Sequence, residues 1–352
     1  MKPAINIVRI IVGILFIFSG MIKAIDPLGL AYKMQEFFEV WAKDGYIPGL
    51  MMYLYKYALA FALVMITLEV LLGVALLLGY AKKLVTWLLL LLIIFFTFLT
   101  SYVLFTGKIR ACGCFGDCIP LTPVQTFIKD IILLLCIIIL LIKRNLISNV
   151  LKPFVCKSIL FITLLLMAAL QWYVLHHLPL IDCLPYKKGN NILELRKMPA
   201  DAVPDKFDYI FIYEKGGEKK EFAVSALPDS TWKFVDRKQT LVQKGKNNIP
   251  LINDFFLRSL DGNDSITAIL SQPGEYYLFF INDFNKGTNA WSTAFVDLWQ
   301  TAKDANRNLY IVTAQPAAAD TYFNQLNKFG IPVFTCDATA IKTAARVLPA
   351  VF

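Results

Sequence analysis

Three of the seven cysteines lie in one short hairpin, and they offer the most definite chemistry in the sequence. The segment reads Cys112-Gly113-Cys114-Phe115-Gly116-Asp117-Cys118. Its two glycines let the backbone fold tightly, so any two of the three thiols can meet. A bridge between Cys112 and Cys114 would close a very small, strained ring. Strain raises the reduction potential of a disulfide, so such a bond would act as an oxidant or a labile switch and not as a structural disulfide.

The residues around the hairpin favour the thiolate, which is the form that performs exchange. Lys108 and Arg110 are near Cys112, and Cys118 precedes the N-terminus of a predicted helix. Cys183 is a candidate resolving partner, although the sequence alone does not bring it to the hairpin. Redox exchange, a purely structural disulfide and a metal site are the three alternatives. No metal is expected, because no histidine is near and the spacing matches no usual zinc finger.

The remaining cysteines are of two kinds. Cys136 and Cys156 fall inside apolar stretches, where a buried thiol behaves as a small apolar side chain. Cys336 belongs to the C-terminal half, on the same predicted side of the membrane as the hairpin. Disulfides on that side require an oxidising compartment.

The elements that position the hairpin are membrane helices. The 352-residue chain is 57% hydrophobic, above the roughly 45–50% of soluble chains. Intrinsic disorder, a collagen-like structure and a single soluble domain are therefore excluded. Five stretches reach the length of about 20 residues that a bilayer requires: Ala4–Ile25, Tyr57–Gly79, Leu84–Thr106, Thr122–Ile142 and Val155–Leu175.

The charge distribution predicts how these helices are oriented. Residues 1–189 carry 17 Lys and Arg against 8 Asp and Glu, whereas residues 190–352 carry 18 against 18. The net charge of +9 therefore lies between hydrophobic runs and not on a soluble basic face, which argues against a nucleic-acid partner. The cations near one set of helix ends place the N-terminus in the cytoplasm: Lys2, Arg9, Lys82, Lys83, Lys143, Arg144, Lys152 and Lys157.

Besides Arg9 and Lys157, which lie near the cytoplasmic helix ends, four ionisable residues fall within the predicted spans: Lys23, Glu69, Lys129 and Asp130. Charge inside a bilayer is expensive, so each is a functional candidate with a partner to be found. We expect Glu69 and Asp130 to face the bundle interior, either paired with Lys23 or Lys129 or held protonated. Beside the hairpin they would form a proton path or a pocket for a quinone head. The alternative is a structural polar clasp between helices.

Local signals refine the connections between the spans. Thr122 is an N-cap candidate, with Pro123 at the first helical position and Gln125 completing a capping box. The 26–49 segment, in which aromatic and charged residues alternate, is either an interfacial helix or an ordinary loop.

Several of these segments resemble the DoxX/MauE-like membrane proteins. The resemblance rests on Phe16–Lys23, on Glu69-x-x-Leu72-Gly73 and on the Cys112–Asp117 hairpin, and it covers roughly residues 4–145. It implies a four-helix membrane unit, here 1–145, with a thiol-redox or quinone-linked role resting on Cys112 and Cys114. MauE-like proteins are associated with maturation of the disulfide-rich small subunit of methylamine dehydrogenase. The fifth helix, within 146–178, and the large outer domain depart from the minimal family unit.

The C-terminal half is predicted to be α/β. Residues 179–207 are expected to be a linker and 208–248 a β-hairpin region with a turn at 215–218. From residue 275 strands (276–281, 309–313 and 333–336) alternate with helices (293–305, 317–329 and 339–346), which implies a parallel sheet.

Residues 249–352 resemble a thioredoxin-like domain of the TlpA type. The resemblance rests on Ile249-Pro250, Asp254-Phe255 and Asp261-Gly262 followed by this order of elements. Where a redox thioredoxin has Cys-x-x-Cys, this chain has 285–290, which contain no cysteine. Pro349 occupies the place of the family's cis-proline, and the chain ends at Phe352 before the last hairpin, as expected of a truncated or shortened domain.

The sequence therefore predicts an inner-membrane protein with five transmembrane helices and a periplasmic thioredoxin-like domain that lacks its redox pair. Its expected function is thiol–disulfide chemistry, with quinone as a candidate cofactor, in the maturation or oxidation of a periplasmic client protein or thiol carrier. The residues expected to act are Cys112, Cys114 and Cys118, with Cys183 as partner. The alternative is a non-catalytic assembly factor or scaffold whose hairpin disulfide is structural and whose outer domain binds a partner.

Overall fold

The computed structural model describes residues 2–109, 118–119, 121–177, 181–243, 245–282, 284, 289–346, 348 and 350–351. The chain divides into two compact units, Met1–Leu184 and Pro185–Phe352. The first unit is helical, and the second combines helices with two β-sheets.

Among the described residues of the first unit, five helices are long and apolar enough to cross a membrane. They are α1 (Lys2–Ile25), α4 (Ala58–Leu78), α5 (Lys82–Thr106), α6 (Pro123–Ile142) and α7 (Pro153–His176). Their ends lie within two residues of the predicted ones. The predicted capping box at the start of α6 is formed, because the Thr122 hydroxyl accepts from the Gln125 amide while the Gln125 side chain accepts from the Thr122 amide.

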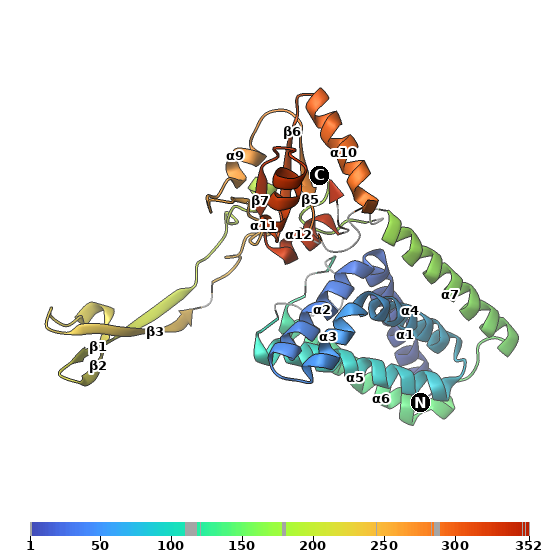
Figure 1. Cartoon of the computed structure of the whole chain (residues 1–352). Helices are drawn as coiled ribbons and strands as arrows, with labels where there is room; N and C mark the ends of the chain where they lie inside the picture. Colours follow the sequence, from blue (N-terminus) through green and yellow to red (C-terminus); the bar gives the residue numbers. More distant parts are fainter. Residues whose placement is uncertain are drawn as a thin grey trace. The chain divides into compact units, whose positions relative to one another are not determined.

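Four of these helices close into a bundle, visible in Figure 1. Helix α1 contacts α4, α4 contacts α5, α5 contacts α6, and α6 returns to α1. The core between them contains Phe16, Ile66, Leu89 and Ile137, all buried. Helix α7 contacts α4 and α1 from outside, and only 11% of its most apolar stretch is buried, against 44% for α1 and α4. The fifth helix is therefore an addition to a four-helix unit.

Small residues bring α1 and α4 together. A Cβ built on Gly73 of α4 would lie 2.9 Å from the carbonyl oxygen of Gly13 and 3.1 Å from the amide nitrogen of Ile17. A Cβ on Gly20 would similarly meet Val70 at 2.6 Å. Because backbone atoms cannot move aside as side chains can, glycine at these positions sets how closely the two helices approach.

The 26–49 segment, expected to be an interfacial helix or a loop, is mostly helical and packs into the bundle. Helix α2 (Pro27–Lys43) begins with Asp26 as N-cap and buries Met34, Phe37 and Phe38 in the core. The short helix α3 (Pro48–Lys56) follows and has no buried residue. The apolar face of α2 thus belongs to the protein interior.

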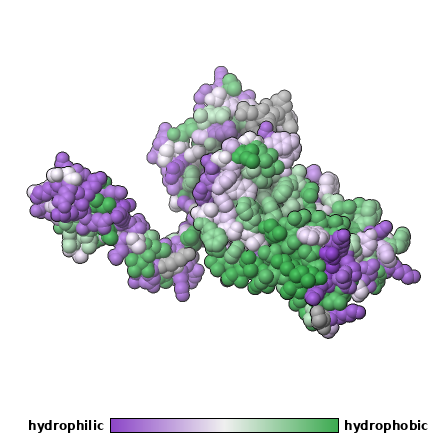
Figure 2. Space-filling model, turned by 90° about the horizontal axis from the view of Figure 1, so that it is seen from below, coloured by the Kyte–Doolittle hydropathy of each residue, from purple (hydrophilic) through white to green (hydrophobic). Residues whose placement is uncertain are grey.

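The outer surface of the bundle is apolar. Figure 2 shows a broad hydrophobic area over the helical part of the chain. The exposed apolar side chains of these helices include Ile14 on α1, Leu91 on α5, Ile132 on α6 and Leu166 on α7. A surface of this kind is stable only against lipid, so the first unit is an integral membrane domain.

The C-terminal unit contains a three-stranded antiparallel sheet, ordered β2-β1-β3. Its strands are β1 (Lys206–Lys215), β2 (Glu218–Ala223) and β3 (Lys233–Gln243), which are coloured from yellow-green to yellow in Figure 1. A 3₁₀ turn, η2 (Val224–Ala226), lies between β2 and β3. The predicted hairpin forms β1 and β2, whereas β3 was not predicted. All of β3 is exposed, so burial imposes no alternation of apolar and polar residues on it.

The second sheet has five strands in the order β4-β7-β6-β5-β8. The three central strands, β5 (Tyr276–Phe280), β6 (Asn308–Thr313) and β7 (Val333–Thr335), are parallel, as predicted. Two short strands, β4 (Arg258–Ser259) and β8 (Ala350–Val351), pair antiparallel with β7 and β5. The helices of this part are α9 (Ile266–Leu270), α10 (Asn289–Asp304), α11 (Pro316–Asp320) with the π-helical turn η3 (Thr321–Leu326), and α12 (Ala338–Ala345).

Helices cover both faces of this sheet, with a separate core on each face. Phe280 and Val312 point to one side, where they pack with Ile341 of α12. Phe279 and Ile311 point to the other side, where they pack with Phe295 of α10. This three-layer order of strands and helices is the thioredoxin-like arrangement expected from the sequence.

The expected linker, 179–207, is partly folded into the second unit. Tyr186 is buried beside Phe255, and the short helix α8 (Ile192–Leu195) supplies Ile192 and Leu193 to the same core. The compact second unit thus begins at Pro185.

Candidate thiol-redox and intramembrane site

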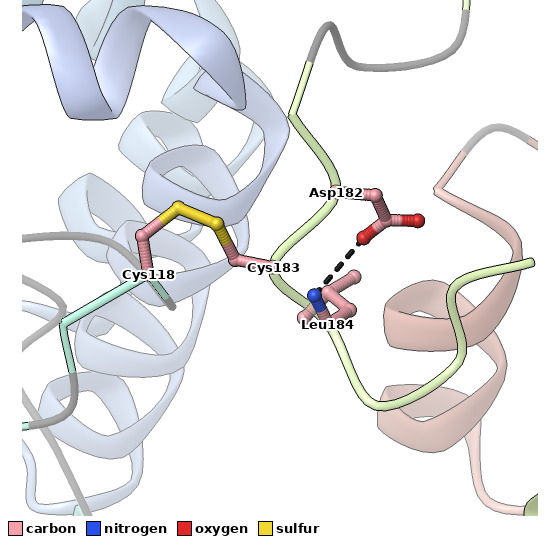
Figure 3. The surroundings of a disulfide bond; sticks show 4 residues. All are labelled: Cys118, Asp182, Cys183 and Leu184. Carbon is pink, nitrogen blue, oxygen red and sulfur yellow. Dashed lines mark hydrogen bonds between the residues drawn. A yellow bond between two sulfur atoms is a disulfide. The ribbon is translucent and has the colours of Figure 1, made fainter. Parts of the chain in front are cut away.

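The structure joins Cys118 to Cys183 in a disulfide, shown in Figure 3. The Cα atoms are 4.9 Å apart, within the usual range for a disulfide. Cys118 precedes the N-terminus of α6 and Cys183 follows the C-terminus of α7, so antiparallel helices bring the two residues to the same end of the bundle. Beside the bond, the Leu184 amide donates to the Asp182 carboxylate at 3.0 Å and closes a tight turn around Cys183.

Cys112 and Cys114 lie outside the described residues, but both ends of their hairpin are anchored. Ile109 is buried in the bundle core before it, and the disulfide holds Cys118 after it. The eight residues between these anchors, 110–117, include Cys112 and Cys114.

An ion pair fixes the approach to the hairpin. The Lys108 ammonium lies 2.5 Å from the Asp44 carboxylate, and the Tyr102 hydroxyl donates to the same carboxylate at 2.8 Å. The hydrogen bond from Lys108 holds the pKa of Asp44 below its usual value, so this carboxylate is charged at neutral pH. The pair ties the C-terminal end of α2 to the end of α5 from which the hairpin departs.

Inside the bundle, Lys23 and Glu69 form a buried ion pair. The Lys23 ammonium is 2.7 and 3.0 Å from the two Glu69 oxygens, and both residues are at most 3% exposed. The ammonium also donates to Ser19 at 3.1 Å and lies 4.4 Å from the centre of the Phe96 ring. The two charges thus neutralise each other, and the Lys23 ammonium has further contacts with α1 and α5.

A second pair lies on α6. The Lys129 ammonium is 2.9 Å from the Asp130 carboxylate, which is buried and within 3.1 Å of the Thr100 hydroxyl on α5. Glu69 and Asp130 both face the bundle interior, and each is paired with a lysine. The four ionisable residues predicted as an intramembrane site therefore occur as two ion pairs.

The two ion pairs share one cavity. It has a volume of about 30 Å³ and is lined by Ser19, Lys23, Glu69, Lys129 and Asp130 together with apolar residues of α1, α5 and α6. At roughly 10–15 Å³ per water, it has room for about two water molecules. The sequence analysis did not predict Ser19, Phe96 and Thr100 as residues of the intramembrane site. Ser19 carried a usable signal, since it precedes Lys23 by one helical turn.

A larger groove opens beside this cavity toward the lipid side. It measures about 330 Å³ and lies between α1 and α6, lined by Leu15, Gln125, Ile128, Lys129, Ile132 and Leu133. Leu15, Lys129 and Leu133 line both spaces. The groove has the size of a small-molecule site, whereas the cavity does not.

The thioredoxin-like domain retains one thiol, Cys336, which is free and buried next to the end of β7. Burial raises the pKa of this thiol to about 11. Nearby, the Tyr186 hydroxyl donates to Asp254 at 3.4 Å, and burial raises the pKa of that hydroxyl also. Residues 285–288, in the place of the family's redox pair, and Pro349 lie outside the described residues.

The other two cysteines are inside the membrane domain. Cys156 is buried, and Cys136 is partly buried on α6. Both are free.

Two segments of the chain match known protein families. Residues 1–143 match the family of methylamine utilisation protein MauE, and residues 207–244 match a domain of unknown function, DUF8463. Protein TlpB of Flavobacterium psychrophilum is 35% identical over 144 residues, which are 39% of this chain and 37% of that protein. The chain thus matches a little over a third of the length of this curated relative. No solved structure matches.

The membrane domain is therefore MauE-like, and a thioredoxin-like domain follows it.

Proposed function

We propose that this protein oxidises thiols of an extracytoplasmic client at the end of the bundle that carries the Cys118–Cys183 disulfide. The observation that carries the proposal is that disulfide, whose Cys118 follows Cys112-Gly113-Cys114 in the sequence by four residues and lies at one end of a MauE-like bundle. A client thiolate attacks the Cys112–Cys114 disulfide and forms a mixed disulfide. A second thiol of the client then attacks the client sulfur of this mixed disulfide and displaces the hairpin cysteine, leaving the client oxidised and both hairpin cysteines as thiols.

Cys118 and Cys183 have a different place in this scheme from the hairpin pair. With Cys118 bonded to Cys183, the exchanging pair is Cys112 and Cys114. The second disulfide either relays electrons from them or keeps the hairpin beside the bundle. Substitution of both Cys118 and Cys183 distinguishes these roles. A relay is needed for turnover of the dithiol substrate, whereas a positioning bond is needed only for stability of the protein.

The re-oxidation of the hairpin requires an electron acceptor, and a membrane quinone is the class we propose. The 30 Å³ cavity is far too small for a quinone ring, whereas the 330 Å³ groove between α1 and α6 is large enough. Lys129 and Gln125 would contact the head there, and apolar residues of both helices would line it. A quinone bound in the groove supplies a two-electron, two-proton acceptor.

The ion pairs behind the groove would move the protons. Lys129 lines both spaces and pairs with Asp130, and the Lys23–Glu69 pair lines the same cavity. A carboxylate whose lysine partner releases it becomes a proton acceptor in the membrane interior. The ion pairs support this role by their position, and a purely structural clasp is the competing explanation.

We place the N-terminus in the cytoplasm and the C-terminal domain in the periplasm of an inner membrane. Five crossings put the two chain ends on opposite sides, and the cation-rich helix ends favour the cytoplasm. Membrane-impermeant maleimide applied to intact cells after reduction is expected to label the hairpin. Labelling only after the membrane is broken would contradict this orientation.

Separate Cys112→Ser and Cys114→Ser variants test the proposed function. Each is expected to abolish oxidation of a dithiol peptide by membranes while leaving the thermal midpoint of the protein unchanged. Cys136→Ser, a cysteine inside α6, is the matched control and retains activity. Full activity in both hairpin variants would overturn the proposal.

The second candidate function is a non-catalytic assembly factor. It is favoured by the Cys118–Cys183 bond, which joins the flanks of α6 and α7 as a structural staple would. On this alternative the thioredoxin-like domain binds a client or thiol carrier without exchange. Two results together would support it: loss of folding when the Cys118–Cys183 disulfide is removed, and unchanged oxidation of the dithiol peptide by membranes in Cys112→Ser and Cys114→Ser.

A further inference from the structure

The end of the bundle opposite the disulfide is strongly cationic. Residues 2–9, 79–83 and 143–157 meet at this end and contain no Asp or Glu. They contain eight lysines and arginines, namely Lys2, Arg9, Lys82, Lys83, Lys143, Arg144, Lys152 and Lys157. A surface of one sign without counter-charges attracts anions.

A groove opens at this end beside the start of α5. It measures about 590 Å³ and is lined by Ala81, Lys82, Lys83, Leu84, Trp87 and Asn149. A groove that combines two ammonium groups with a leucine and a tryptophan is suited to an amphipathic molecule.

Hydrogen bonds hold the Asn149 wall of the groove in place. Arg9, which is 6% exposed, donates to the Ser148 carbonyl at 3.1 Å, and Lys82 donates to the Ile147 carbonyl at 2.8 Å. The Val150 amide donates to the Leu78 carbonyl at 3.0 Å. The groove is therefore built before any ligand enters, and the Lys82 ammonium is already engaged in building it.

Lys83 is the cation that remains for a ligand. Its side chain is exposed, and in the described part of the chain its ammonium has neither a carboxylate partner nor a hydrogen-bond acceptor. It lies in the first turn of α5, whose N-terminus has no side-chain cap. The orientation of the helix dipole adds to the attraction for an anion at this point.

An apolar strip runs along α5 from the groove into the membrane. Leu84, Trp87, Leu91, Ile94 and Phe98 follow at intervals of three and four residues, and each is between 47% and 60% exposed. At ~1.5 Å per residue the strip is roughly 21 Å long, enough to cover one leaflet of the hydrocarbon core. A ligand that uses the groove and the strip together has an anionic head and a long apolar tail.

We propose that this groove binds an anionic phospholipid. Lys83 contacts its phosphate, Trp87 lies at the level of the glycerol and ester groups, and an acyl chain follows the strip from Leu91 to Phe98. Charge complementarity selects an anionic over a zwitterionic head, and the strip selects a lipid over a soluble phosphate ester. The site is distinct from the thiol chemistry at the other end of the bundle.

Native mass spectrometry of the full-length protein tests this site. Phosphatidylglycerol and phosphatidylcholine are titrated separately into the detergent-purified protein. We expect phosphatidylglycerol to be retained in preference, with about fivefold weaker binding in Lys83→Gln, which removes one lysine near the headgroup. Lys157→Gln is the matched control, because Lys157 is an exposed cation at the same end but outside the groove.

Each other outcome overturns the proposal. Equal retention of the two lipids would remove the preference for an anionic head. An equal loss of binding in Lys83→Gln and Lys157→Gln would indicate a diffuse field and not a site. Displacement of the lipid by millimolar glycerol 3-phosphate would indicate a site for soluble anions. Lys83 is exposed, so Lys83→Gln is expected to keep the wild-type thermal midpoint, which is measured alongside.

Discussion

At the scale of single residues, the Lys23–Glu69 pair is the most demanding feature of the membrane domain. Removing one partner leaves the other charge buried and unpaired, which costs about 3–5 kcal/mol, whereas replacing both by apolar residues is often neutral. We therefore expect Glu69→Leu to lower the thermal midpoint strongly and Lys23→Met/Glu69→Leu to restore most of it. Thermal unfolding in detergent measures both.

The same double variant separates function from structure. If the pair moves protons, the doubly substituted protein folds but oxidises thiols slowly; if the pair is a clasp, it works at the wild-type rate. Lys33→Met/Glu36→Leu removes a partly exposed pair on α2 and serves as the control, with little change expected in either property. Strong destabilisation by the Lys23/Glu69 double variant would contradict the energetic argument.

Cys336 is expected to be inert in the folded protein. Burial raises its pKa to about 11, so at pH 8 roughly one thiol in a thousand is ionised, and the reactive thiolate fraction rises with pH. Maleimide at pH 8 should label Cys336 only after denaturation. Rapid labelling in the native state would show that the thioredoxin-like domain exposes a reactive thiol after all.

Residue identity predicted which groups belong to the intramembrane site but not how they pair. Glu69 and Asp130 stand out because any charge in an apolar stretch does. Their choice between Lys23 and Lys129 depends on the rotation and depth of three helices, which the sequence leaves open. The same holds for Cys118 and Cys183, since the sequence allows either of them to pair with Cys112 or Cys114 as well, and the structure forms the bond between Cys118 and Cys183.

At the scale of elements, the contact of α1 with α4 sets the geometry of the ion pair. Gly73 approaches the Gly13 carbonyl, and Glu69 lies one turn before it on the same helix. Gly73→Val should force the helices apart, destabilise the protein and weaken the Lys23–Glu69 contact. Gly49→Val on α3, where an added Cβ meets nothing within 4 Å, is the control. Equal thermal midpoints of the two variants would contradict the proposed packing.

Elements were predictable where burial or solvation imposes a pattern. The membrane helices and the parallel strands are marked by long or alternating apolar runs. Strand β3 has no such mark, because both of its faces are exposed and its sequence is free to be polar. Helix α2 was ambiguous for a different reason: its aromatic residues suit an interface as well as a core, and only the bundle shows that Phe37 is buried.

At the scale of the whole molecule, the second unit has its own cores on both faces of its sheet. We expect residues 185–352 to fold without the membrane domain, giving a soluble protein with a cooperative thermal transition in circular dichroism. It should show no dithiol oxidation, because its single cysteine is buried. An insoluble or unfolded product would show that the membrane domain is needed for its folding.

The central claim is thiol exchange at the hairpin, and trapping the mixed disulfide tests it most directly. A client peptide with a single cysteine is supplied as its disulfide-linked dimer to the variants in which either Cys112 or Cys114 is replaced by serine. The remaining hairpin thiolate attacks this disulfide, which forms a mixed disulfide and releases one peptide thiol, and no neighbouring hairpin thiol is present to displace the bound peptide. We expect one of these variants to give a reductant-sensitive adduct on non-reducing gels, which is absent from Cys112→Ser/Cys114→Ser. If neither single variant forms such an adduct, or if the adduct persists in the double variant, the claim is contradicted.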